Sequence, residues 1–394
     1  MISVEEAKKI IRENVIELQP LQLPLKDAVG LVLAEDVYAT VYIPPFNQSS
    51  MDGYAFSFKG WQLHHKLEVA GEVPAGRNDM LTLAPNQAVR IFTGAPVPDS
   101  ADTVVMQEKV KLEDGELLLE DETIEKGTNI RAKGFEIKPG SRALVKGDHL
   151  SPAAIGFLAG IGVTDVRVFP KPSISIIVTG KELQQPGKPL QYGQVYESNS
   201  LTLLAALQGL HISEVRVLLV DDDLEKLNDT LQNELALSDV VLLSGGISVG
   251  DYDFVLEAAT QCGVTKLFHR LRQRPGKPLY FGKKDHKMVF GLPGNPSSVL
   301  TCFYEYVLPA LQQLSGSKKE LPVLQVPLAK AINKAVGLTH FLKGFYNGEE
   351  ATALDAQESY RLSSFAKANC LIKIGEEVTH CDEQELVEIH LLPA

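Results

Sequence analysis

Three loops rich in glycine and hydroxyl or acidic side chains each follow an apolar stretch that predicts a strand. They cover residues 179–183, 244–253 and 291–298. Because glycine has no Cβ, backbone N–H groups in such loops can approach the oxygens of a phosphate closely. The third loop also opens a predicted helix, whose first N–H groups are free to bind an anion. A single loop of this kind is usually only a tight turn, but three at one sheet favour a site for phosphates.

Acidic side chains accompany these loops and suggest a metal ion. In chain order they are Glu182, Asp222, Asp223, Asp251 and Asp253. Carboxylates beside phosphate-binding backbone are typical of Mg²⁺ sites, because the ion bridges carboxylate and phosphate oxygens. The alternative for Asp222 and Asp223 is capping of the following helix, a position that Asp favours.

A basic tract interrupts a chain whose net charge is −12. Between residues 266 and 287, eight Lys and Arg residues stand against one acid. Arg274 and Lys277 lie three residues apart around Pro275 and Gly276, so both can point at one small oxyanion. The alternatives are a solvated strand face for the tract and an ordinary surface turn for residues 273–278.

Two loops in the N-terminal half also have the residue types of a binding site. Residues 44–55 surround one carboxylate, Asp52, with small uncharged side chains. Residues 90–98 contain the turn Thr93-Gly94-Ala95-Pro96, which no local propensity explains. The alternative is a pair of rigid turns in a β-rich domain.

The elements that must position the glycine-rich loops alternate between strand and helix from residue 173 to about 314. Apolar strands are predicted at 174–178, 215–220, 240–243 and 288–290, and helices at 200–208, 224–235, 254–261 and 297–314. This alternation predicts a parallel, doubly wound sheet, which binds ligands at the carboxyl ends of its strands.

Different patterns flank this region. Ser3 and Glu6 form a capping box for a helix over 4–18, and Ser151-Pro152 begins a second helix. Short β patterns between turns predict a β-rich region up to about 150 and a small β domain over 320–394.

Composition excludes several classes of protein. No apolar run reaches the ~18 residues that span a bilayer, and the first residues lack the pattern of a signal peptide. The negative charge argues against nucleic acid and anionic membranes as partners. The four cysteines form no C-x-x-C pair and predict reduced thiols. We therefore expect a cytoplasmic protein with no nucleic-acid or membrane partner.

Seven stretches, taken in order, resemble the molybdopterin molybdenumtransferase family, which includes the MoeA type and the E domain of gephyrin. They are PPFNQSSMDGYA, RIFTGAPVPDSADTVVMQE, NIRAKGFEI, TGKEL, SGGISVGDYD, RPGKP and GLPGNPSS, and they cover residues 44 to about 305. A weaker match continues through HFLKG and QESYRLSSFAKAN. Each motif is moderately specific, whereas the ordered series is highly specific.

The resemblance implies a multidomain α/β and β architecture. Its parts are a discontinuous linking α+β domain (1–22 and 140–172), an inserted β-rich domain (23–139), a doubly wound molybdopterin-binding domain like that of the pterin adenylyltransferase (173–318), and a C-terminal β-barrel-like domain (319–394). It also implies an elongated homodimer, with the active site in a cleft between subunits, and contact with the pterin adenylyltransferase.

The activity implied by the resemblance is molybdenum cofactor biosynthesis. The substrates would be molybdate and adenylylated molybdopterin, and Mg²⁺-dependent cleavage of the pterin–AMP anhydride would release AMP. Both substrates are anions, in keeping with the loops and the basic turn. The alternatives are pterin adenylylation, a non-enzymatic scaffold like that of gephyrin, and insertion of tungstate.

Matched position by position, the resemblance also implies residue roles. The catalytic residues would be Asp52, Thr93, Glu182 and Asp253, and the metal ligands Glu182, Asp251 and Asp253. The pterin nucleotide would contact Ser244, Gly245, Gly246, Ser248, Gly250, Asp222, Asp223 and Glu136. Molybdate would contact Arg274, Lys277, Ser298, Lys343, and Ser359 or Ser364, between which the sequence does not choose.

Three positions depart from the family pattern. Arg274 stands where Lys is usual, Lys343 where Arg is usual, and Glu136 where Asp is common. Charge is kept at all three, but Lys and Arg do not grip an oxyanion with the same geometry.

Overall fold

The computed structural model describes residues 1–76, 79, 81–245 and 254–393. The chain divides into two compact units, each described here by itself. Unit 1 comprises Met1–Leu21, Gly30–Ala34 and Arg167–Ala394, and unit 2 comprises Gln22–Val29 and Glu35–Val166. The four domain boundaries stay a prediction.

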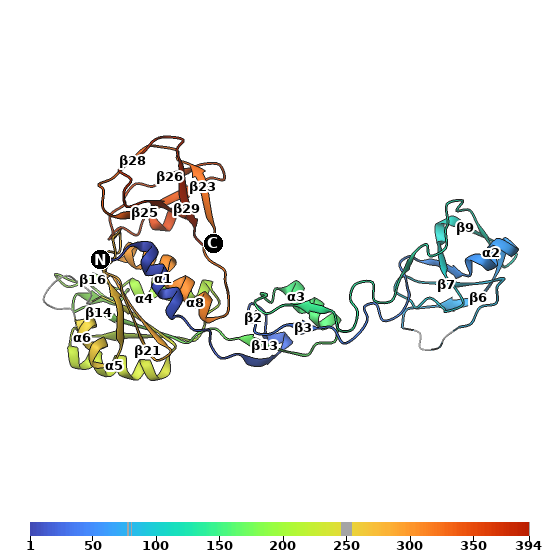
Figure 1. Ribbon diagram of the computed structural model, residues 1–394, viewed down its shortest axis with the longest axis horizontal. Coiled ribbons are helices and arrows are strands. Elements are labelled where there is room, and N and C mark those ends of the chain that lie inside the picture. The colour runs from blue at the N-terminus through green and yellow to red at the C-terminus, as the bar shows by residue number, and fades with distance from the viewer. Residues whose placement is uncertain (77–78, 80, 246–253, 394) are drawn as a thin grey trace. The chain divides into compact units, whose positions relative to one another are not determined.

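A six-stranded sheet forms the core of one part of unit 1. Figure 1 shows it between α1 (Val4–Asn14), α4 (Asn199–Gly209) and α8 (Leu308–Leu314) on one side and α5 (Leu224–Leu237) and α6 (Phe254–Gln261) on the other. In spatial order its strands are β17 (Val215–Val220), β14 (Ile174–Thr179), β18 (Val240–Ser244), β22 (Lys287–Leu292), β21 (Tyr280–Lys284) and β19 (Thr265–His269). The first four are parallel, which confirms the predicted doubly wound sheet. The last two are antiparallel and were not predicted as strands, because they lie in the basic tract, whose charges obscure the apolar alternation.

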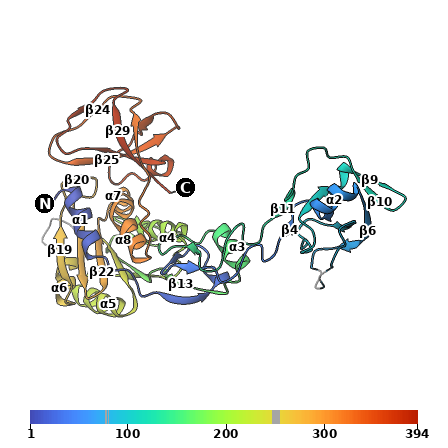
Figure 2. The ribbon, with the colours of Figure 1, turned by 45° about the vertical axis from the view of Figure 1, so that its right-hand side comes forward.

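Helices cover both faces of this sheet, because successive strand residues point to opposite sides. Ile176 and Leu242 face one side, on which α1, α4, α7 (Pro296–Cys302) and α8 pack. Ile177 and Leu243 face α5 and α6 on the other side. The two helical layers are visible on opposite sides of the sheet in Figures 1 and 2.

The strand order reverses at β14. From β14 the chain passes through α4 to β17 on one side, and then through α5 to β18 on the other side. Connections that leave in opposite directions open a crevice at the carboxyl ends of the two strands, where such sheets bind ligands. In this chain the crevice lies between Thr179 and Ser244.

Two predicted helices differ from the observed ones. α1 is capped by Ser3 as predicted but ends at Asn14, because Val15 is extended and the Gln313 side chain satisfies the carbonyls of Arg12 and Val15. The helix predicted over 297–314 contains a π-helical turn, Phe303–Val307, between α7 and α8.

A second sheet of unit 1 is formed by the C-terminal part of the chain. Its order is β20 (Gln273–Arg274), β25 (Thr339–Tyr346), β27 (Cys370–Ile374), β29 (Leu386–Leu391) and β23 (Val323–Pro327). β20 lies in the chain between β19 and β21 of the doubly wound sheet, but it pairs with β25. The basic tract therefore connects the two sheets. The remaining short elements are β2 (Val32–Leu33), β13 (Asp165–Phe169), β15 (Leu183–Gln184), β16 (Val195–Tyr196), β24 (Ile332–Asn333), β26 (Ala351–Ala353), η4 (Phe365–Lys367) and β28 (His380–Cys381).

Unit 2 is β-rich, as predicted. Its main sheet has the order β8 (Thr103–Met106), β5 (Gly53–Phe56), β7 (Gln87–Ile91), β6 (Lys66–Val73), β10 (Glu116–Leu119) and β9 (Val110–Glu113). The shorter strands are β1 (Leu21–Pro24), β3 (Val37–Tyr38), β4 (Gln48–Ser49), β11 (Ile130–Arg131) and β12 (Arg142–Leu144). The helices are η1 (Leu25–Asp27), α2 (Phe58–His64), η2 (Gln107–Lys109) and α3 (Pro152–Gly160), which Ser151 caps as predicted.

None of the helices in the described part of the chain has the length and apolar character to span a membrane. The expected location in the cytoplasm stays a prediction.

The core of the doubly wound sheet can be tested with two Leu→Ala variants. Leu242 is fully buried, so Leu242→Ala should lower the free energy of unfolding by about 2–5 kcal/mol. Leu237, at the end of α5, is 58% exposed, so Leu237→Ala is the matched control and should change it little. Urea unfolding followed by circular dichroism would measure both, and equal losses would contradict this description of the core.

Candidate functional site

A buried side-chain amide joins two of the predicted anion-binding loops. Asn199 begins α4, and its Nδ2 donates hydrogen bonds to Ser244 Oγ at 3.0 Å and to the Gly294 carbonyl at 2.8 Å. Ser244 ends β18, and Gly294 follows β22. The loops at 244–253 and 291–298 therefore begin at one common point. Sequence reasoning did not single out Asn199, because an Asn at the start of a helix is ordinarily a cap.

Gly245 brings the loop after β18 against the end of β14. Its φ is +93°, a region that favours glycine, and a Cβ here would lie 2.2 Å from the Thr179 carbonyl oxygen. No other residue fits without moving the backbone. The close approach of two loops at the crevice thus explains why glycine is needed at position 245, and its contact with the pterin nucleotide stays a prediction.

Polar atoms without partners surround this junction. Thr179 Oγ1, Asn199 Oδ1 and Ser297 Oγ are buried, and none has a hydrogen-bond partner among the described residues. A buried polar group without a partner costs free energy. A polar ligand at this edge of the sheet would satisfy such groups.

Two of the predicted acids have distinct roles in the structure. Asp222 accepts a hydrogen bond from the Lys181 backbone N–H at 3.2 Å, so it reaches the loop after β14. Asp223 instead caps α5 through the Lys226 backbone N–H at 3.0 Å. The helix-capping alternative therefore describes Asp223, while Asp222 contacts the loop after β14.

Glu182 is exposed in the loop after β14, close to where Asp222 meets it. Within the described ranges, no group of three His, Cys, Asp or Glu side chains could hold a metal ion by itself. Magnesium usually takes one or two carboxylates together with substrate phosphates. Glu182 and Asp222 carry carboxylate oxygens, the kind of donor that such an ion takes. The other predicted residues of this edge lie outside the described residues: Gly246, Ser248, Gly250, Asp251 and Asp253.

The basic turn carries two exposed cations. The side chains of Arg274 and Lys277 have no hydrogen bond or ion pair in the described part of the chain, whereas Arg272 pairs with Glu376 at 2.7 Å. The turn packs closely on α7, since a Cβ on Gly276 would lie 2.5 Å from Cys302 Sγ. Burial, followed by the charges of Lys334 and Arg274, lowers the pKa of His340 to about 4, so this neighbour adds no positive charge at neutral pH.

The two candidate serines of the C-terminal region lie in different surroundings. Ser359 Oγ accepts a hydrogen bond from Asn295 Nδ2 at 2.8 Å, and its carbonyl accepts one from the Ser297 N–H at 3.0 Å. Ser364 is buried and donates to the Ala356 carbonyl. The geometry thus places Ser359 beside the loop at 291–298, on which the buried Ser298 also lies.

Lys343 is 2% exposed, and its position favours a different role from the predicted one. Its Nζ donates to the carbonyls of Ala356, Glu358 and Arg361 at 2.6, 3.3 and 3.0 Å. An ammonium group has three N–H donors, and all three are used here. Lys343 therefore holds the loop that carries Ser359, which leaves no donor for direct contact with an oxyanion.

In unit 2 the structure brings Asp52 and Thr93 together. Asp52 Oδ1 accepts hydrogen bonds from the Thr93 N–H at 2.7 Å and from Thr93 Oγ1 at 2.8 Å. These bonds, with a smaller effect of the Arg90 charge, lower the pKa of Asp52 and keep it a carboxylate at neutral pH. Both residues are exposed. The two loops that sequence reasoning singled out thus form one surface feature.

Glu136 lies on a neighbouring segment of unit 2. Its backbone N–H donates to the Ile43 carbonyl at 2.9 Å, and its side chain is exposed. The segment is tied to the same loop, because Asn47 Oδ1 accepts from the Lys133 N–H at 3.0 Å. Its carboxylate points to no described partner, so its predicted role stays a prediction.

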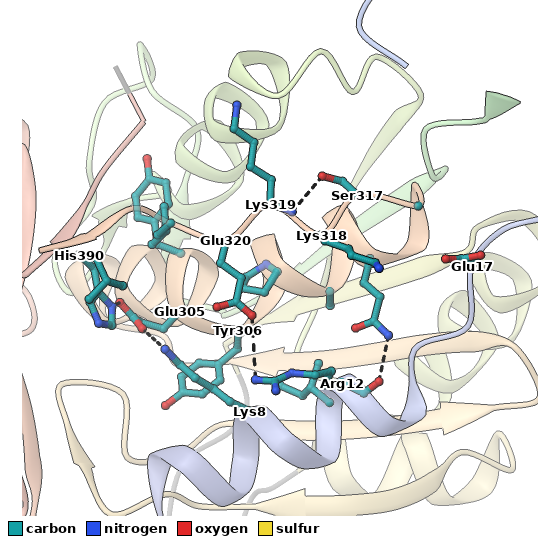
Figure 3. A pocket seen from close by; sticks show the side chains of 18 residues that line it. Lys8, Arg12, Glu17, Glu305, Tyr306, Ser317, Lys318, Lys319, Glu320 and His390 are labelled. Carbon is teal, nitrogen blue, oxygen red and sulfur yellow. Dashed lines mark hydrogen bonds and ion pairs between the residues drawn. The ribbon is translucent and has the colours of Figure 1, made fainter. Parts of the chain in front are cut away.

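A separate pocket of about 380 Å³ lies elsewhere in unit 1 (Figure 3). Its walls come from α1, the helical residues 304–313 and the segment 316–323, and they include Lys8, Arg12, Glu305 and His390. None of the predicted site residues lines it. The pocket is therefore distinct from the crevice at the sheet edge.

Three family models together match most of the chain. Residues 2–162 match the MoeA N-terminal region (domain I and II), residues 175–313 a probable molybdopterin binding domain, and residues 325–392 the MoeA C-terminal region (domain IV).

Relatives and solved structures agree with these models. The chain is 33% identical to the molybdopterin molybdenumtransferase of Haemophilus influenzae over 100% of both chains. It is 34% identical to that of Staphylococcus epidermidis, over 95% of this chain and 89% of the relative. The crystal structure of the molybdopterin biosynthesis MoeA protein from Pyrococcus horikoshii OT3 matches 100% of both chains, with a TM-score of 0.84 and 29% identity. The chain therefore belongs to the molybdopterin molybdenumtransferase (MoeA) family and is a transferase of molybdenum cofactor biosynthesis.

Proposed function

We propose that this enzyme inserts molybdate into adenylylated molybdopterin, with Mg²⁺-dependent cleavage of the pterin–AMP anhydride and release of AMP. One observation carries the proposal. The loops that follow β14, β18 and β22 meet at Asn199 and Gly245, and polar atoms that are buried without a partner among the described residues surround that junction. This is the arrangement that a phosphorylated ligand needs at a topological switch point.

The pterin nucleotide would occupy this crevice. Backbone N–H groups of the loops, with Thr179 Oγ1 and Ser297 Oγ as side-chain donors, would bind its phosphate oxygens. Such donors are fixed before the substrate arrives, so little reorganisation is needed when charge develops in the transition state. Asn199 would act in two ways, by holding the loops and by offering Oδ1 to a donor on the substrate.

Molybdate would bind at the basic turn. Arg274 and Lys277 offer positive charge that no described acid neutralises, and Ser359 and Ser298 lie on the adjacent loops. Lys343 would contribute indirectly by holding residues 356–361. Molybdate and tungstate are similar oxyanions, so both should be tried as substrates in the test below.

Magnesium, when bound, would neutralise the negative charge on the anhydride oxygens. Glu182 and Asp222 would hold it together with substrate phosphate, and Asp251 and Asp253 complete the proposed set. Molybdate and the pterin nucleotide are both anions, so the enzyme must bring them together against their repulsion. This chain's residues would do so by positioning the two substrates. Asp52, kept ionised by Thr93, is the proposed catalytic carboxylate of unit 2.

A homodimer, contact with the pterin adenylyltransferase and residence in the cytoplasm belong to the same proposal. They are supported by family membership alone.

Removal of the cation at the basic turn should impair molybdate use. Lys277→Ala should raise the molybdate concentration needed for half-maximal AMP release by about 10- to 100-fold, because a charge-assisted hydrogen bond is lost. Lys266→Ala, which removes an exposed cation of the same tract, is the control and should leave the value unchanged. Release of AMP from adenylylated molybdopterin by the purified full chain would be followed. If wild type released none with molybdate or tungstate, the proposed function would be wrong.

Loss of the amide at the loop junction should weaken nucleotide binding. Asn199→Ala leaves Ser244 Oγ and the Gly294 carbonyl without their donor, so we expect the KM for adenylylated molybdopterin to rise about tenfold. Asn233→Ala, at an exposed position of α5, is the control. An unchanged KM in a folded Asn199→Ala variant would show that the junction does not serve the pterin nucleotide.

The metal requirement can be tested by removal and return. Chelation should stop AMP release, and added Mg²⁺ should restore it. Glu182→Gln should raise the Mg²⁺ concentration required severalfold, since a neutral amide is a weaker ligand than a carboxylate. Glu225→Gln, on the exposed side of α5, should leave the requirement unchanged. AMP release that persists in the chelator would argue against magnesium.

A further inference from the structure

We propose that Gln273 and Tyr306 are positioning residues that hold the Arg274–Lys277 turn in the geometry in which it binds its oxyanion. The inference rests on the proposed function, because it takes this turn to be the molybdate site. Neither residue touches the substrate, so each would act only through the turn.

The Gln273 side chain is buried directly beneath the turn. Its Nε2 donates to the Pro275 carbonyl at 2.9 Å and to the Gly276 carbonyl at 3.2 Å. Its Oε1 accepts a hydrogen bond from the Tyr306 hydroxyl. Both ends of the amide are thus engaged in a fully buried environment. A satisfied buried network of this kind fixes one conformation, because any other leaves a polar group without a partner.

Tyr306 lies in the π-helical turn between α7 and α8, and this turn positions its side chain. Only 1% of Tyr306 is exposed, and its hydroxyl donates to Gln273. Burial is the main cause that raises the pKa of Tyr306 well above its ordinary value, and the nearby Cys302 and Glu305 add to it. The hydroxyl therefore keeps its proton and remains a donor at any working pH. The π turn adds a residue to the helix relative to α geometry, and such turns often occur at functional sites.

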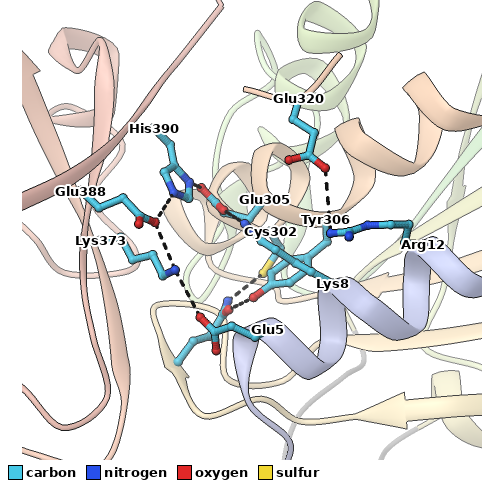
Figure 4. A network of polar contacts seen from close by, with 11 residues as sticks. Glu5, Lys8, Arg12, Cys302, Glu305, Tyr306, Glu320, Lys373, Glu388 and His390 are labelled. Atoms are coloured by element: carbon cyan, nitrogen blue, oxygen red, sulfur yellow. Dashed lines mark hydrogen bonds and ion pairs between the residues drawn. The ribbon is translucent and has the colours of Figure 1, made fainter. Parts of the chain in front are cut away.

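A polar network at Glu305, the residue before Tyr306, anchors this π turn (Figure 4). Glu305, 1% exposed, accepts hydrogen bonds from Lys8 of α1 and from His390 of β29. Burial would raise the pKa of Glu305, but these two partners outweigh it and lower the pKa, so the carboxylate stays ionised. The other ring nitrogen of His390 is hydrogen-bonded to the Glu388 carboxylate. Two separate elements therefore hold the turn from which Tyr306 projects.

The two cations of the turn depend on this support. Arg274 and Lys277 are exposed, and within the described residues no partner fixes their side chains. The backbone between them then sets the positions from which the two side chains extend. That backbone is supported from below by Gln273 and packed at Gly276 against Cys302. Small displacements of binding groups weaken recognition strongly, so loss of the support should appear as weaker oxyanion binding.

Tyr306→Phe tests the proposal with the smallest change, since it removes one hydroxyl and keeps the ring. We expect molybdate binding to the full chain, measured by equilibrium dialysis, to weaken about three- to tenfold, as for the loss of one hydrogen bond. The KM for molybdate in AMP release should rise by the same factor, while the KM for adenylylated molybdopterin stays unchanged. A merely structural role would not separate the two constants.

Tyr304→Phe is the matched control. Tyr304 lies in the same π turn, and no hydrogen bond of its hydroxyl is found among the described residues. The control variant should bind molybdate as wild type does. Gln273→Met, which keeps the side-chain length without the amide, should show at least the effect of Tyr306→Phe. The double variant should bind molybdate no more weakly than Gln273→Met alone, because both changes interrupt the same chain of hydrogen bonds from Tyr306 through Gln273 to the turn. We call this chain of hydrogen bonds the relay.

The outcomes distinguish this inference from the proposed function. If wild type binds molybdate, Lys277→Ala does not, and folded Tyr306→Phe and Gln273→Met bind normally, the relay is wrong and the function stands. Equal weakening in Tyr304→Phe, or equal rises in both KM values, would also overturn the relay. If wild type binds no molybdate, both proposals are wrong.

Discussion

The hydrogen bonds of one buried amide hold the binding edge of unit 1 together. At the switch point, the chain leaves β14 and β18 in opposite directions, so nothing in the strands themselves connects the loops beyond them. Asn199 supplies that connection by donating to Ser244 and Gly294, and Gly245 permits the remaining approach to Thr179. Thr179 Oγ1, Asn199 Oδ1 and Ser297 Oγ are buried near this junction and have no partner within the described parts of residues 1–245 and 254–393. A polar ligand can supply the hydrogen bonds that these atoms lack.

The handling of positive charge follows a related principle. The chain is acidic overall, and cations of the basic tract such as Arg272 and Lys287 are neutralised by Glu376 and Asp239. Arg274 and Lys277 project from a turn whose backbone is held from below. Because the backbone of the turn is already ordered, only the two side chains lose freedom when an anion binds, so the entropic cost is lower than for cations on a mobile loop.

Lys343 shows why a departure from a family pattern needs the structure for its interpretation. The resemblance implies that Arg is usual at this position, and from the sequence the replacement suggested an altered geometry of contact with molybdate. In the structure three backbone carbonyls converge on one nitrogen atom, a geometry that suits the three donors of an ammonium group. The position thus supports the loop of Ser359, and Lys serves that purpose well.

Local patterns in the sequence determined much of this protein. Apolar runs and caps predicted the four parallel strands and most of their helices, because burial and periodicity act over short distances. The ordered motifs predicted the family and picked out Asp52 with Thr93, which the fold indeed brings into contact. Only the tertiary structure decided that Asn199 ties two loops, that Ser359 rather than Ser364 lies beside the loop at 291–298, that Asp222 contacts the loop after β14, and that β19 and β21 complete the sheet. The physical reason is that each of these depends on which residues, distant along the chain, share a buried space, and such hydrogen bonds and packing leave no periodic trace in the sequence.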